Sequence, residues 1–157
     1  MSSPESIPPG LSLVAYAEQL CKGARVLIVG KSAVTLANAV LDRGARLVHV
    51  FERDPARRAE ALARSASRAV TFGSPEEGLR EGFFDLVLVE NLANEPDHKE
   101  TVRTLSKMMA PRAAALIAAP NPEATRPLLA SAGASRLDYY ALYDAVAAAL
   151  PHVRMIG

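Results

Sequence analysis

Cysteine is nearly absent from this chain of 157 residues, in which Cys21 is the single example. One cysteine cannot form an internal disulfide. Cys21 also has no cysteine or histidine neighbour at the spacing that metal ligands use. We therefore expect a reducing compartment, the cytoplasm, and no metal site.

An excess of one charge and long apolar runs are lacking as well. The 18 Lys and Arg residues are balanced by 17 Asp and Glu residues, a formal net charge of +1, so the composition gives no reason to expect nucleic acid as a partner. No apolar run reaches the length that crosses a membrane.

Residues 1–10 have neither the basic nor the apolar part of a secretory signal. We expect them to be a flexible lead-in to one domain over residues 11–157, alone or as part of a longer protein.

Short apolar runs typical of buried parallel strands alternate with segments of helical periodicity. The expected strands are 26–29, 46–52, 68–72, 84–90, 113–119 and 152–156. The expected helices are 11–22, 34–41, 54–65, a short one from Ser74, 97–111, 121–133 and 139–150. This alternation predicts a doubly wound, mainly parallel, Rossmann-like α/β sheet with helices on both faces.

The turn after the first strand, Gly30 to Val34, is where a sheet of this kind binds ligands. A phosphate-binding loop that ends in Gly-Lys-Ser needs a glycine where Arg25 stands, and a dinucleotide fingerprint needs glycines where Ser32 and Thr35 stand. Both motifs are therefore excluded.

Three stretches, in order, resemble class I S-adenosylmethionine (SAM) dependent methyltransferases. They are residues 23–30, 48–55 and 84–91, and residues 151–155 resemble a later strand of that family. The resemblance implies a Rossmann-like fold with SAM as cofactor. It also implies a cofactor site formed by Gly30, Lys31, Ser32, Glu52 and Glu90, in which Glu52 takes the ribose hydroxyls. A carboxylate suits that role because it can accept from two adjacent hydroxyls.

The loop departs from the family pattern at two places. Ser32 and Val34 stand where the family has glycines that let the backbone approach the cofactor. Two functions therefore remain open: a methyltransferase-like domain without catalysis that acts as a protein-binding or regulatory module, and an active SAM-dependent methyltransferase. A receiver-like signalling domain is disfavoured by the number of expected strands. The sequence indicates no catalytic residue and no substrate.

Two local expectations follow for the crevice. We expect residues 30–34 to close over it, with the Val34 side chain filling space that the family leaves open. We also expect Lys31 to pair with Glu52 or Glu90, because a cation beside a helix N-terminus is disfavoured.

Two further expectations concern surfaces. The last expected strand carries Val153, Met155 and Ile156 and would leave an apolar edge. Such an edge recruits other chains, so we expect self-association or a protein partner there. Tyr139, Tyr140 and Tyr143 lie on one expected helix, where they either pack against the sheet or contact a partner.

Overall fold

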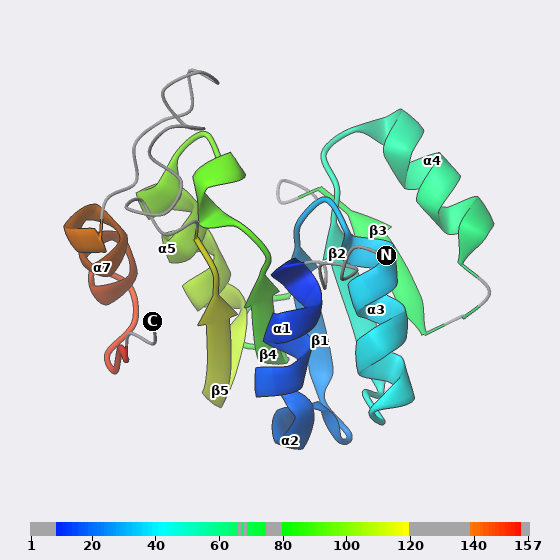
Figure 1. Ribbon diagram of the computed structural model, residues 1–157, viewed down its shortest axis with the longest axis horizontal. Coiled ribbons are helices and arrows are strands. Elements are labelled where there is room, and N and C mark those ends of the chain that lie inside the picture. The colour runs from blue at the N-terminus through cyan, green and yellow to red at the C-terminus, as the bar shows by residue number, and fades with distance from the viewer. Residues whose placement is uncertain (1–8, 66, 68, 75–79, 120–138, 155–157) are drawn as a thin grey trace, which may run out of the picture.

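The computed structural model describes residues 9–65, 67, 69–74, 80–119 and 139–154. Within these residues five parallel strands form one sheet in the order β3-β2-β1-β4-β5 (Figure 1). The strands are β1 (Arg25–Val29), β2 (Leu47–Phe51), β3 (Val70–Gly73), β4 (Phe84–Val89) and β5 (Met109–Ile117). This sheet confirms the predicted doubly wound α/β class.

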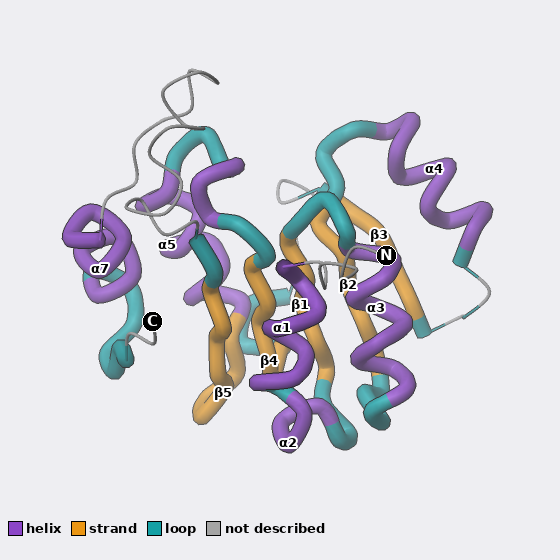
Figure 2. Tube along the Cα trace, viewed as in Figure 1, coloured by secondary structure: helices purple, strands orange, loops and turns teal. Residues whose placement is uncertain are grey.

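Helices cover both faces of the sheet (Figure 2). They are α1 (Pro9–Tyr16), α2 (Glu18–Cys21), α3 (Ala33–Asp42), α4 (Pro55–Arg64), the short 3-10 helix η1 (Leu92–Asn94), α5 (His98–Met108) and α7 (Tyr139–Ala147). α1 and α3 lie on one face, and α5 lies on the other. Among the described helices, we find no segment with the length and the apolar composition that a membrane span requires.

Alternation along β1 builds two cores from one apolar run. Val26 and Ile28 belong to the core under α1 and α3, whereas Leu27 and Val29 belong to the core under α5. All four side chains are at most 4% exposed. A central strand covered on both faces needs an unbroken apolar run of this kind, which explains why β1 was predictable from sequence.

Helix α4 is the exception to this layered packing. It begins as predicted, with the Asp54 side chain accepting from the backbone nitrogen of Ala56 at 2.9 Å and Pro55 as its first residue. No residue of α4 is buried, however, and its only large apolar side chain, Leu62, is 60% exposed. α4 connects β2 to the edge strand β3, and its axis diverges from the sheet (Figure 1).

Some predicted boundaries were wrong. The first helix begins at Pro9, inside the expected lead-in, and is interrupted at Ala17. β5 begins at Met109, four residues before the predicted start at residue 113. A register shift lies between Phe84 and Leu86 of β4 and their β5 partners. Pro111 in this stretch has no backbone N–H to donate to a ladder, so an irregular segment accommodates it.

The end of the chain also differs from prediction. The expected sixth strand is not formed over His152–Arg154, and the rest of that strand lies outside the described residues. The expected helix over 121–133 also lies outside the described residues. Of the short helix expected from Ser74, only Ser74 is described, and it is not helical. Among the described residues, β5 is therefore the last strand on its side of the sheet.

Candidate functional site

The candidate site is the crevice at the carboxyl ends of β1, β2 and β4. β1 lies between β2 and β4, and the chain leaves these strands in opposite directions, through α3 to β2 and through α5 to β5. Ligands of open α/β sheets bind at such a switch point. Parallel pairing of β1 with both neighbours brings Gly30, Glu52 and Glu90 to one edge of the sheet, because each follows the last residue of its strand.

Glu90 occupies the centre of this edge. Its Oε2 accepts a hydrogen bond from the backbone nitrogen of Ser32 at 2.9 Å. A β-carbon on residue 30 would lie 2.3 Å from the same oxygen, so Glu90 can take this position only above a glycine. From the other side Gly10 of α1 approaches, since a β-carbon there would lie 3.3 Å from Glu90 Cγ. The side chain of Glu90 thus fills the space between the Gly30 turn and the start of α1.

Glu52 is engaged with its own loop. Its Oε1 accepts from the backbone nitrogen of Asp54 at 3.0 Å, and the side chain is half-buried. This hydrogen bond holds the carboxylate close to the start of α4. The ribose-binding role of Glu52 stays a prediction.

Lys31 does not form the predicted ion pair. Its side chain is exposed, and it pairs with neither Glu52 nor Glu90, whose carboxylates accept from backbone N–H groups instead. An exposed ammonium group is stabilised by water without a carboxylate partner, because surface ion pairs contribute little to folding stability. Val34 is half-buried in the first turn of α3. Its predicted filling of the crevice stays a prediction, and the side chain that the structure places over Gly30 is that of Glu90.

An ion pair that the sequence did not indicate joins the loops on either side of β1. Nη1 of Arg53, after β2, lies 2.8 Å from Oε2 of Glu95, after β4. The Glu95 side chain is 12% exposed and that of Arg53 is 49% exposed. No sequence spacing could have signalled a pair 42 residues apart. The pair links the two loops that flank the switch point.

A cavity of about 400 Å³ lies beside this ion pair, between the end of β2 and the first turns of α5. Its lining is Phe51, Arg53, Pro96, Asp97, Glu100, Thr101 and Thr104. Asp97 is already used as the N-cap of α5, where it accepts from the nitrogen of Glu100 at 2.9 Å. None of the five predicted cofactor residues lines this cavity.

Histidine and metal chemistry have little support in the described part of the chain. His49 is 8% exposed on β2, and its Nδ1 lies 2.7 Å from Thr71 Oγ1 on β3. His49 is therefore a buried residue of the sheet, held by a neighbouring strand. No group of three or more His, Cys, Asp or Glu side chains that could hold a metal ion occurs among the described residues.

Neither a protein-family model nor a curated protein matches the chain. Solved structures do. A Mesorhizobium loti SAM-dependent methyltransferase matches 75% of this chain at 18% identity and TM-score 0.63. The complex of the Haloferax volcanii Trm112 methyltransferase activator with a candidate methyltransferase matches 90% of this chain, at 14% identity and TM-score 0.76. The [4+2]-cyclase SpnF matches 88% at 19% identity and TM-score 0.66.

These similarities establish the fold. The chain has the fold of class I SAM-dependent methyltransferases. It spans 55%, 66% and 54% of the three matching chains. The cyclase among them illustrates that one fold can carry different chemistry, so the function must be argued from the site.

Proposed function

We propose that this chain is a methyltransferase-like domain that does not catalyse methyl transfer and acts as a protein-binding or regulatory module. The observation that carries the proposal is the position of Glu90, hydrogen-bonded to Ser32 and in contact with Gly30. A side chain of the protein itself thereby occupies the point of the fold at which a ligand would approach the backbone.

Displacing Glu90 has a cost. A hydrogen bond to a charged group contributes about 1.5–3 kcal/mol, and partial exposure of Glu90 puts this one toward the lower end. A cofactor would have to recover that loss and also separate Glu90 from the turn at Gly30. The ion pair of Arg53 and Glu95 adds a second contact that opposes separation of the surrounding loops.

A binding role is supported by the complexes in which proteins of similar fold are found. One matching structure is the complex with the Trm112 methyltransferase activator, and another is a Trypanosoma brucei PRMT1 enzyme–prozyme heterotetrameric complex. Those assemblies belong to those proteins. They support the inference that a domain of this fold can serve through contacts with other chains.

The alternative is an active SAM-dependent methyltransferase. It is favoured by two carboxylates, those of Glu52 and Glu90, at the carboxyl ends of β2 and β4, the strands on either side of β1. It is also favoured by matching enzymes such as a Burkholderia thailandensis methyltransferase with bound S-adenosylhomocysteine. In that case the Glu90 side chain would leave Ser32 when the cofactor enters, and Glu52 would hold the ribose.

Thermal denaturation with SAM separates the two. A site with a Kd of about 100 μM would stabilise the protein by about 1.4 kcal/mol at roughly 1 mM SAM. For a domain of this size that is a rise in Tm of roughly 3–6 °C. We expect no such rise, and a rise of this size would favour the active enzyme.

A further inference from the structure

The free edge of β5 carries backbone groups that no described strand uses. β5 pairs with β4 on one side only, and no other described strand lies beyond it. Ala118 directs both its backbone groups toward β4, since its nitrogen donates to Val89 and its oxygen accepts from Leu92. Backbone groups of successive residues in a strand point to opposite sides, so those of Ala115, Ile117 and Ala119 face the open edge.

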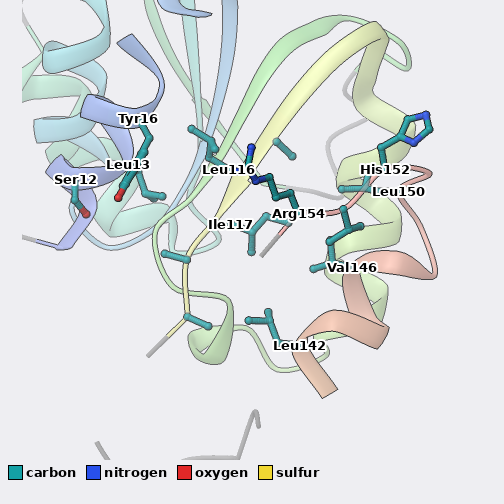
Figure 3. A pocket seen from close by; sticks show the side chains of 14 residues that line it. Ser12, Leu13, Tyr16, Leu116, Ile117, Leu142, Val146, Leu150, His152 and Arg154 are labelled. Atoms are coloured by element: carbon teal, nitrogen blue, oxygen red, sulfur yellow. The ribbon is translucent and has the colours of Figure 1, made fainter. Parts of the chain in front are cut away.

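A cavity of about 320 Å³ lies along this edge. Its lining comes from the end of β5, the second half of α1, α7, Leu150 and residues 152–154. Figure 3 shows Leu142 and Val146 of α7 on one side of it and Leu13 and Tyr16 of α1 on the other. The edge is therefore bordered by apolar side chains from both faces of the sheet.

The shape and polarity of this groove favour an extended polypeptide. A purely apolar ligand would leave the outward N–H and C=O groups of Ala115 and Ile117 without partners, and an unpaired group removed from water is costly. An added strand would satisfy these groups and place alternate side chains against α1 and α7.

Charge further defines the occupant. Arg154 is the one residue with a permanent charge in the lining of the groove, and it forms no ion pair with any residue that the structure describes. Figure 3 shows its side chain directed toward Leu116 of β5. β5 itself contains Arg112 and no acidic residue. A second copy that added its own β5 would thus bring basic residues to a basic groove.

We propose that the edge of β5 binds an extended segment of another protein as an additional strand, with an acidic residue of that segment at Arg154. This names a partner class for the proposed binding function and in that sense rests on it. The site is separate from the crevice at Glu90, so the test below does not depend on SAM.

The probe is a fluorescently labelled synthetic peptide of about nine residues, with alternating threonine and valine and a glutamate at each end. We expect saturable binding by anisotropy, about tenfold tighter than for the same peptide with terminal lysines. Hydrogen exchange at the amides of Ala115 and Ile117 should slow about tenfold at saturation. Arg154→Ala should remove the preference for glutamate, and Arg112→Ala is the matched control that should retain it.

A second variant tests strand addition itself. Ala115→Pro removes an outward N–H without removing a β4 hydrogen bond and should weaken binding about tenfold, whereas Ala115→Ser, which keeps the N–H, should not. The proposal is overturned by absent peptide binding, by equal affinity for the two peptides, or by unchanged exchange at Ala115 and Ile117. Strong protection of these amides in the free monomer would show that the chain covers its own edge. A dimer that dissociates when Ala115→Pro is introduced would show that a second copy of the chain covers the edge.

Discussion

The carboxylate of Glu90 accepts a hydrogen bond from the backbone nitrogen of Ser32 at 2.9 Å, directly beside the α-carbon of Gly30. Ser32 and Glu90 lie 58 positions apart in the chain and meet because β1 and β4 are neighbours in the sheet. The contact gives Gly30 a structural reason to be glycine that is independent of any cofactor.

Gly30→Ala should therefore destabilise the protein by about 1–3 kcal/mol, the usual cost of overpacking. Because the new methyl group would meet both Oε2 and Cβ of Glu90, the cost should fall in a Glu90→Gly background. Urea denaturation of the four proteins in this cycle gives the coupling, which should exceed about 0.5 kcal/mol. Additive effects would mean that the two residues do not touch.

The ion pair of Arg53 and Glu95 should be worth more than an exposed pair. Arg53→Ala leaves a carboxylate that is only 12% exposed without this partner, so the free energy of unfolding should fall by about 1 kcal/mol. As a control, Arg64→Ala on α4, whose partner Glu60 is 59% exposed, should change it by less than about 0.5 kcal/mol. Restoration of stability by Arg53→Glu with Glu95→Arg would confirm a charge effect, and equal losses for Arg53→Ala and Arg64→Ala would contradict it.

Acid stability should depend on Asp85. Hydrogen bonds from the Arg25 side chain, at 2.8 Å from Nε and from Nη2, lower the pKa of Asp85 from 3.8 to about 2. A folded pKa below the unfolded value stabilises the protein above about pH 4, and this contribution is lost as the pH falls toward 2. Solvent screening reduces its size, because the Asp85 side chain is 40% exposed.

The measurement is urea denaturation at a series of pH values from about 5 to 2. The unfolding free energy of Asp85→Asn should decline less steeply below about pH 4 than that of the unchanged protein. Parallel curves for the two proteins would show that Asp85 has an ordinary pKa.

Cys21 should be unreactive in the folded protein. The residue is fully buried, and this burial raises the pKa of its thiol above its ordinary value. Since the thiolate is the nucleophile, reaction with a disulfide reagent at neutral pH should occur only as the protein opens. The rate should rise with added urea below the unfolding transition. Immediate full labelling without denaturant would contradict the burial.

Local signals in the sequence were sufficient for much of the fold. The apolar run of β1 and the Asp54-Pro55 start of α4 were predicted because each depends on near neighbours in the chain. The position of α4 was not predictable, since its periodicity shows an apolar stripe but not whether the sheet extends beneath it. β5 began earlier than expected because an irregular segment accommodates Pro111, which sequence patterns treat as a terminator.

The sequence predicted which strand ends come together, but not the contacts that their side chains make. The topology correctly brings Gly30, Glu52 and Glu90 to one edge of the sheet. Which partner each carboxylate takes depends on side-chain positions in three dimensions. For that reason the expected pairing of Lys31 was wrong, and the hydrogen bond that the Ser32 backbone nitrogen donates to Glu90 was missed.

Calorimetric titration with S-adenosylhomocysteine measures whether the chain's own Glu90 closes the crevice to a cofactor. For the unchanged protein we predict a Kd weaker than about 100 μM, equivalent to less than about 5.5 kcal/mol of binding free energy. Glu90→Ala, titrated in parallel, should bind more tightly if this side chain is the main obstacle. Binding to the unchanged protein with a Kd below about 100 μM would show that Glu90 does not close the crevice and would favour an active methyltransferase.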